Sequence, residues 1–191
     1  MVFRARLDRR QNAAAWNAHN FADEGHFSGE NVMAIALTVK SYLAQNQVAF
    51  DLITHRHSAS SLNTASEAHI QPGRLAKAVL LEDERVPNRF LMAVVPASHR
   101  LEMARLSRQV GRPVHLATER DATALFKDCE KGAIPALGPA YGVETIVDDC
   151  LMEQPDLYFE AGDHEHLVHL ETRELFWLLS ECGHGEFSRP L

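Results

Sequence analysis

Two apolar runs of strand length, residues 75–82 and 90–95, constrain the fold of this chain more than any other feature. The segment between them contains Pro87 and Asn88, a pair typical of a turn. Two such runs joined by a short polar segment predict an antiparallel hairpin. The first run also carries a lysine, Lys77. A buried ammonium is costly unless a polar partner or a ligand meets it, so Lys77 is a candidate functional residue.

A loop rich in glycine and proline is the second informative feature, with the sequence Gly132-Ala133-Ile134-Pro135-Ala136-Leu137-Gly138-Pro139. Proline fixes the backbone shape, and glycine lets a ligand approach backbone N–H groups closely. Together, Lys77 and this loop suggest a pocket with an ammonium on one side and backbone donors on the other. Each feature alone has a simpler interpretation. The loop can be an ordinary turn, and Lys77 can lie at a sheet edge or pair with an acidic side chain.

The other apolar patterns alternate between helical and strand periodicity. They predict helices over 34–46, 64–69, 101–110, 121–126 and 171–181, and strands over 48–53, 113–116, 143–148, 157–161 and 166–170. Asn63 or Ser61 is the expected cap of the second helix. Because the elements follow no regular βαβ order, the sequence predicts an α+β domain. We expect a mixed, largely antiparallel sheet with helices packed around it.

The length of 191 residues, with 46% hydrophobic and 24% charged residues, favours one domain. Residues 1–31 are rich in Asn, Ala, His and charge, so we expect an N-terminal extension that is peripheral or disordered. Residues 32–183 form the expected domain, and 184–191 a short polar C-terminal tail.

The net charge of −7 argues against a broad surface for duplex DNA, although a small site for an RNA end stays compatible with it. The three cysteines have no Cys-x-x-Cys spacing, which favours a reducing compartment over disulfides or a cysteine zinc site. No apolar run reaches the roughly 20 residues that span a bilayer, and no signal peptide is recognisable. A cytoplasmic protein without membrane contact is the expectation.

Four segments, in order, resemble the YbaK-like family of prolyl-tRNA-synthetase-associated editing domains. They are Gly73–Leu81 with its lysine, Met92–Ala97, Asp121–Phe126 leading into Gly132–Gly138, and Phe159–His164. The similarity covers roughly residues 34–181. It implies the editing-domain fold and hydrolysis of the ester bond in mischarged aminoacyl-tRNA, with no metal and no other cofactor.

The resemblance also implies roles for individual residues. Lys77 and the backbone N–H groups of Gly132 and Ala133 are the expected catalytic groups, because a cation and preorganised donors stabilise the oxyanion of ester hydrolysis. The expected substrate-binding residues are Ile134, Pro135, Ala136, Gly138 and His166. The family's loop usually reads Gly-x-x-x-Pro. In this chain the fifth position is Ala136 and the proline stands one residue earlier, which alters the loop.

The expected function is a trans-acting editing hydrolase that removes a small amino acid from mischarged tRNA. Its expected partner is the 3′ end of that tRNA, with an aminoacyl-tRNA synthetase as a further candidate. One alternative is a non-catalytic module that binds an aminoacyl-tRNA end or a synthetase. Another is a metal enzyme built on His164 and His166, which would share one face of a continuous strand. The sequence does not specify the amino acid, the tRNA or the oligomeric state.

Overall fold

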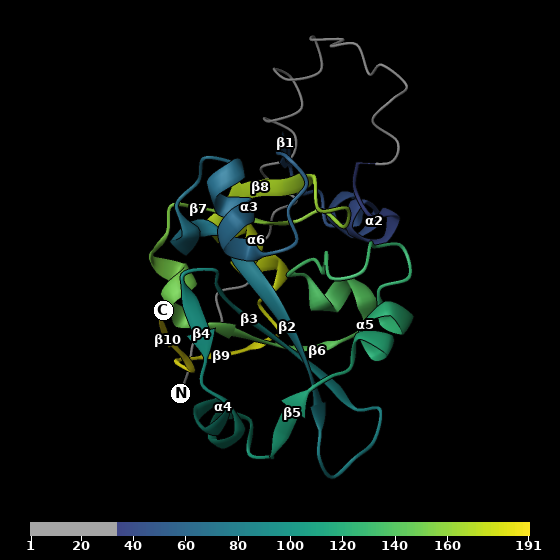
Figure 1. Cartoon of the computed structure of the whole chain (residues 1–191), viewed down its shortest axis with the longest axis vertical. Helices are drawn as coiled ribbons and strands as arrows, with labels where there is room; N and C mark the ends of the chain where they lie inside the picture. The colour runs from purple at the N-terminus through teal and green to yellow at the C-terminus, as the bar shows by residue number, and fades with distance from the viewer. Residues whose placement is uncertain (1–33) are drawn as a thin grey trace, which may run out of the picture. The chain divides into compact units, whose positions relative to one another are not determined.

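The structure is a computed structural model that describes residues 34–191, so the expected extension over 1–31 lies outside the described residues. Figure 1 shows the arrangement of the elements. The longer helices and strands, in chain order, are α2 (Leu37–Gln45), β1 (Asp51–Thr54), α3 (Ser61–Glu67), β2 (Ala76–Asp83), β3 (Phe90–Pro96), β4 (His99–Leu101), α4 (Met103–Val110), β5 (Val114–Leu116), α5 (Glu119–Leu125), β6 (Glu144–Asp148), β7 (Asp156–Glu160), β8 (His166–Glu171), α6 (Thr172–Leu178), β9 (Gly183–Gly185) and β10 (Ser188–Pro190). Short 3₁₀ turns cover Pro72–Arg74, Gly138–Tyr141 and Asp149–Glu153.

A five-stranded sheet with the order β5-β2-β3-β6-β9 contains the predicted hairpin. Strands β2 and β3 pair antiparallel, and Lys77 lies opposite Val95. β5 joins β2 antiparallel, whereas β6 and β9 extend the sheet in parallel. A second sheet, β1-β8-β7, is antiparallel throughout. The predicted α+β class with a largely antiparallel sheet is therefore confirmed.

One hydrophobic core ties the two sheets to the helices. It includes Leu43 of α2, Met92 of β3, Phe159 of β7 and Leu175 of α6, all fully buried. Ala136 of the glycine-proline loop belongs to the same cluster. Apolar packing thus anchors the loop, whose first residue, Gly132, stays exposed.

Local sequence signals set most helix boundaries. Gly111 ends α4 in the left-handed conformation at φ 70°, as expected for a helix C-terminus. Thr118 and Asp121 form a reciprocal capping box that starts α5 at Glu119, two residues before the predicted start. The cap of α3 is Ser60, whose hydroxyl accepts from the Asn63 N–H at 3.3 Å. The prediction of Asn63 or Ser61 as that cap was therefore wrong by one or more residues.

The C-terminal residues 184–191 differ from the expected tail. β9 pairs in parallel with β6, and β10 pairs antiparallel with β4. Phe187 between them is fully buried, and its N–H donates to Asp148 at 3.0 Å. Backbone pairing and one aromatic anchor therefore bring this polar segment into the domain. No helix within residues 34–191 has the length and apolar character needed to cross a membrane.

Candidate functional site

A small pocket of about 40 Å³ brings together groups from three distant parts of the chain. Lys77 comes from β2, and Gly132 and Ile134 come from the glycine-proline loop. Glu160 and His164 come from the end of β7 and the turn that follows it. We call this the Lys77 pocket. It joins the two features, lysine and loop, that the sequence singled out separately.

Lys77 is half-buried, and its Nζ donates to the carbonyl oxygen of His99 at 2.9 Å. It forms no ion pair with any carboxylate of the described residues, so the acidic-partner interpretation does not hold for that part of the chain. Burial lowers the pKa of the Lys77 ammonium. An ammonium has three donors, and the His99 carbonyl takes one of them. Two N–H groups are therefore left for a ligand.

The loop offers free backbone donors, though not the pair that was expected. Gly132 has φ +93°, and within residues 34–191 its N–H has no hydrogen-bond partner. The Ala133 N–H, by contrast, donates to the Glu130 carbonyl at 3.0 Å and is fully buried, so it cannot serve as an oxyanion donor. The N–H of Ile134, also without a partner in that part of the chain, is the second candidate donor.

The other predicted substrate-binding residues of the loop do not line the Lys77 pocket. Pro135 and Ala136 are buried behind it. Gly138 begins a 3₁₀ turn and packs against Thr145, where an added Cβ would collide with the threonine hydroxyl. These residues shape and anchor the loop, and only Ile134 of the predicted loop contacts faces the pocket.

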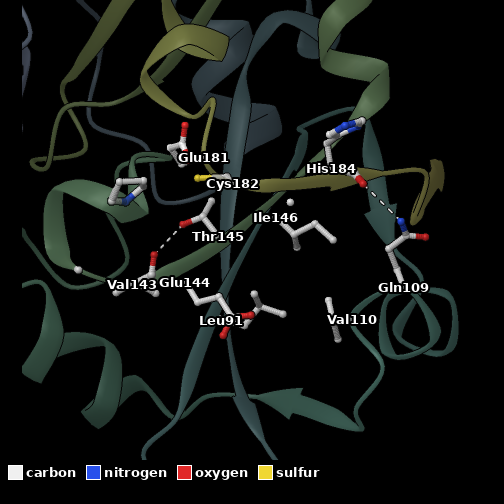
Figure 2. A pocket seen from close by; sticks show the side chains of 13 residues that line it. Leu91, Gln109, Val110, Val143, Glu144, Thr145, Ile146, Glu181, Cys182 and His184 are labelled. Carbon is white, nitrogen blue, oxygen red and sulfur yellow. Dashed lines mark hydrogen bonds between the residues drawn. The ribbon is translucent and has the colours of Figure 1, made fainter. Parts of the chain in front are cut away.

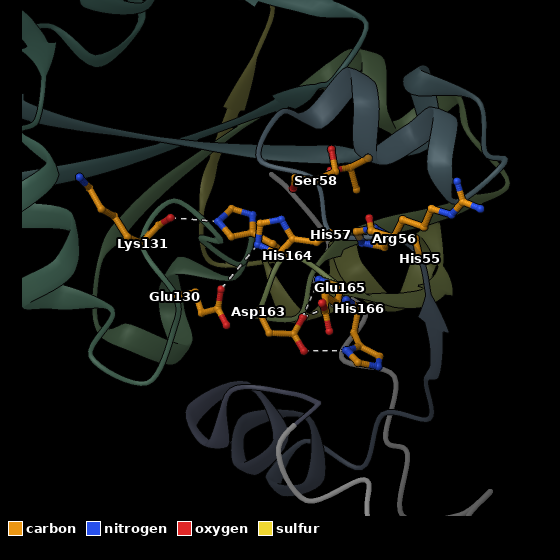
Figure 3. A network of polar contacts seen from close by, with 11 residues as sticks. His55, Arg56, His57, Ser58, Glu130, Lys131, Asp163, His164, Glu165 and His166 are labelled. Carbon is orange, nitrogen blue, oxygen red and sulfur yellow. Dashed lines mark hydrogen bonds and ion pairs between the residues drawn. The ribbon is translucent and has the colours of Figure 1, made fainter.

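His164 lines the pocket, whereas His166 does not. Figure 3 shows the two histidines with their separate partners, Lys131 and Asp163. His164 adopts a left-handed φ of 61° in the turn before β8, and His166 is the first residue of that strand. The prediction that both histidines share a strand face was therefore wrong, because the left-handed residue interrupts the alternation. His166 Nδ1 instead lies 2.6 Å from an oxygen of Asp163.

The hydrogen bond of His164 fixes its tautomer. Its Nε2 lies 2.9 Å from the carbonyl oxygen of Lys131, and a carbonyl can only accept, so Nε2 carries the proton. In the neutral ring Nδ1 is then an acceptor. This atom is buried and has no partner among residues 34–191, and the ring lies 5.4 Å from that of His57. The pocket thus contains a free imidazole acceptor.

Glu160 is a pocket residue that the sequence reasoning missed. Its Oε1 accepts a long hydrogen bond of 3.5 Å from the Thr64 hydroxyl, and its buried Oε2 has no partner in the described part of the chain. Burial raises the pKa of this carboxyl to about 7. Strand alternation with the buried Leu157 and Phe159 places Glu160 on the opposite face. The argument that singled out Lys77, a charge in an apolar strand, would have found it.

Two further hollows adjoin the sheet. A groove of about 270 Å³ shares Ala78, Gly132 and Ile134 with the Lys77 pocket and continues over Ala117 and Phe126. A larger hollow of about 560 Å³ lies over β3, β6 and β9 (Figure 2). None of the predicted site residues lines this larger hollow.

No metal site emerges from the described residues. Within 34–191, no three histidine, cysteine, aspartate or glutamate side chains converge in a way that could hold a metal ion. His164 and His166 have separate partners, the Lys131 carbonyl and Asp163.

The α+β domain thus holds one polar pocket between the hairpin with its lysine, the glycine-proline loop and the turn with His164. The pocket offers hydrogen-bond donors and acceptors to a small polar ligand. The family model of the aminoacyl-tRNA editing domain matches residues 55–177, which is more than half of the chain. The protein belongs to this family, and its role is in tRNA editing, which maintains the fidelity of translation.

Solved structures share the fold. The hypothetical protein APE2540 superposes with a TM-score of 0.70 at 18% identity, covering 80% of this chain and 99% of that chain. A proposed trans-editing enzyme for prolyl-tRNA synthetase gives 0.68 at 18% identity, with coverage of 81% and 96%. A proposed signal transduction protein from Marinobacter aquaeolei VT8 gives 0.63 at 20% identity, covering 79% of this chain and 30% of that one. Comparison with curated protein sequences found no match.

Proposed function

We propose that this protein is a trans-acting aminoacyl-tRNA deacylase, which hydrolyses the ester of a mischarged tRNA carrying a small amino acid. The observation that carries the proposal is that Lys77 and Gly132, whose N–H has no partner among the described residues, line one pocket. Membership of the editing-domain family supports the same reaction class. The 3′ end of a mischarged tRNA is the proposed substrate, and an aminoacyl-tRNA synthetase is a further candidate partner.

The two donors act on the ester carbonyl. When water attacks, negative charge develops on the carbonyl oxygen, and an ammonium together with a backbone N–H stabilises it without reorganisation. In the proposed geometry, Lys77 and Gly132 face this oxygen, with the Ile134 N–H as an additional donor. The intermediate then expels the ribose hydroxyl and leaves the free amino acid.

His164 is the proposed acceptor for the attacking water. Its buried Nδ1 has no partner among the described residues, and its protonated Nε2 is held on the Lys131 carbonyl. In the proposed reaction Nδ1 takes a proton from the attacking water as the new C–O bond forms, and returns it to the ribose oxygen as the ester C–O bond breaks.

The size of the pocket favours a small amino acid. At about 40 Å³ it is the smallest of the three hollows described above, which favours a small side chain over a large one. The adjoining groove of about 270 Å³ offers apolar and polar contacts for the terminal nucleoside.

The test is the deacylation of alanyl, seryl and cysteinyl esters on tRNA for proline by the wild type and Lys77→Ala. We expect hydrolysis of at least one ester and a loss of about 100- to 1000-fold in the variant. Lys127→Ala is the matched control, because Lys127 is exposed and lies outside the pocket. Circular dichroism checks that both variants fold.

Two results would overturn the proposal. Equal activity in the folded Lys77→Ala variant would disprove the site assignment. Failure of the wild type to hydrolyse any of the three esters, while binding a non-hydrolysable aminoacyl-adenosine, would point to the non-catalytic binding module instead.

A further inference from the structure

Glu160 is the only carboxylate among the described residues that line the Lys77 pocket, and the hydrolysis proposed above does not use it. Its side chain is held at the end of β7, with Thr64 of α3 as its one hydrogen-bond partner at 3.5 Å. The second oxygen, Oε2, is buried without a partner in the described part of the chain. A buried carboxylate oxygen without a partner destabilises the folded protein unless a cation or a hydrogen-bond donor binds it.

Neither Lys77 nor His164 bonds Glu160. Lys77 lines the same pocket, but it donates to the His99 carbonyl and forms no ion pair with Glu160. The proton of His164 is directed to Lys131. We therefore expect the group that pairs with the Glu160 carboxylate to belong to the ligand. This group has to carry a positive charge or strong N–H donors.

We propose that Glu160 binds the α-ammonium group of the aminoacyl ester, so that the site selects esters with a free α-amine over N-acylated ones. This inference rests on the proposed deacylase function. In an aminoacyl ester the ammonium and the carbonyl are attached to neighbouring carbon atoms. One small pocket that offers Lys77 and Gly132 to the carbonyl oxygen and Glu160 to the ammonium matches both ends of that unit.

The volume of the pocket is consistent with this arrangement. An N-acetyl group adds three heavy atoms to the amine nitrogen and removes its charge, in a pocket of only about 40 Å³. The unpaired Oε2 would then stay buried without a cation. Selectivity therefore has two physical sources, the lost ion pair and the lack of room.

The protonation of Glu160 gives the arrangement a pH signature. Burial is the main cause that raises the pKa of the carboxyl to about 7; within this net value the charge of His164 acts in the opposite direction and that of Asp163 in the same direction. Lys77 and the Thr64 hydroxyl are the other polar groups around it. Only ionised Glu160 forms the ion pair, so kcat/KM for free-amine esters should rise with pH through about 7. It should fall again as the α-amine of the substrate loses its proton, with a pKa of about 7.7–8.0 in model peptides.

The experiment compares kcat/KM on alanyl-tRNA and N-acetyl-alanyl-tRNA for the wild type, Glu160→Gln and Glu165→Gln. We expect the wild type to prefer the free amine, and Glu160→Gln to lose about 10- to 100-fold on alanyl-tRNA only, the range for a charged hydrogen bond. The preference and the rise through pH 7 should both disappear. Glu165→Gln, which removes an exposed carboxylate from the neighbouring turn, should behave like the wild type.

A loss of equal size on both substrates would overturn the inference, because it would mark Glu160 as a general base or a structural residue. Absence of any wild-type preference for the free amine would overturn it as well.

A binding measurement separates this inference from the proposed function. The probes are 3′-amino-3′-deoxyadenosine carrying an alanyl amide and its N-acetyl derivative, titrated calorimetrically into each protein. If the wild type hydrolyses no ester but binds the free-amine probe about 10-fold or more tightly in a Glu160-dependent way, deacylation fails and ammonium recognition stands. If hydrolysis proceeds and both probes bind alike, deacylation stands and ammonium recognition fails.

Discussion

The Lys77 pocket and the larger hollow over β3, β6 and β9 differ in whether their buried polar groups have hydrogen-bond partners. The hollow is more than ten times larger, at about 560 Å³ against about 40 Å³. Within it the Thr145 hydroxyl donates to the Val143 carbonyl at 2.9 Å, and Gln109 donates to the His184 carbonyl at 3.3 Å (Figure 2).

Two of the charged groups at the hollow are also paired. Glu144 lies 2.8 Å from Arg112, and the His184 ring lies 3.0 Å from Asp149. Among the described residues, no buried side-chain nitrogen or oxygen of the hollow lacks a partner. The Lys77 pocket has two such atoms, His164 Nδ1 and Glu160 Oε2.

Of these two regions, only the Lys77 pocket has buried polar atoms without a partner among the described residues, so we expect polarity and not size to decide which of the two binds substrate. A hollow whose polar groups already have partners gives a ligand little to gain beyond apolar contact. A pocket with a free donor, a free acceptor and an unpaired carboxylate forms additional hydrogen bonds and an ion pair when a ligand binds. Matched substitutions in the two regions test this interpretation.

The largest difference is expected between His164→Ala and His184→Ala. The first removes the free imidazole acceptor of the pocket, and we expect deacylation to fall by about 100-fold or more, as for the loss of a general base. The second removes an exposed ring at the hollow, and deacylation should be unchanged. Single-turnover rates of both variants provide the measurement. Comparable losses in the two variants would remove the distinction between the regions.

A smaller difference should separate Gly132→Ala from Gly142→Ala. Both glycines have positive φ, +93° and +67°, so alanine imposes a similar backbone strain of about 1–2 kcal/mol at each position. Gly132 lies in the Lys77 pocket, and Gly142 lines the hollow. A shift of the loop that relieves the strain misdirects the Gly132 N–H, so deacylation should fall about 10- to 100-fold in the first variant only.

Thermal unfolding of both glycine variants provides the control. Similar decreases in melting temperature with unequal activity would support a specific role for the Gly132 donor. Equal losses of activity would show that backbone strain alone accounts for the effect.

Local patterns in the sequence predicted the parts of this fold that short segments determine. The hairpin of β2 and β3 follows from two apolar runs and a turn, and the end of α4 follows from Gly111. The tail was missed because Ser188–Pro190 carries no apolar pattern, and its pairing with β4 depends on a distant strand. The sequence of a polar segment of three residues does not indicate which strand it will pair with.

The sequence predicted those pocket residues that stand out within their own segment. Lys77 is a charge in an apolar strand, Gly132 is a glycine in a loop with proline, and both line the pocket. Strand alternation could not predict that His164 lines the pocket in place of His166, because this depends on one left-handed residue in the turn. The engagement of the Ala133 N–H by Glu130 is likewise a property of the folded loop.

The last contrast concerns the stability of the fold, in Glu160→Gln and Glu144→Gln. Burial raises the pKa of Glu160 from its ordinary value of 4.5 to about 7, so the folded state binds more protons than the unfolded state between these values. Stability should therefore decrease as pH rises from 4.5 to 7 and then level off. Glutamine resembles the protonated acid, and Glu160→Gln should be more stable than the wild type by about 3 kcal/mol at pH 8 and about equal at pH 4.

Glu144→Gln should do the opposite, because it removes one partner of the ion pairs with Arg112 and Arg89. Since the Glu144 side chain is 45% exposed, we expect a loss of only about 0.5–1 kcal/mol. Urea unfolding at pH 4, 6 and 8 measures both variants. A carboxylate whose removal stabilises the fold while weakening alanyl-tRNA deacylation is retained for its ligand and not for the structure, in line with the usual trade-off at functional sites. If Glu160→Gln were destabilising at pH 8, Glu160 would be a structural residue like Glu144, and the contrast between the two regions would fail at this position.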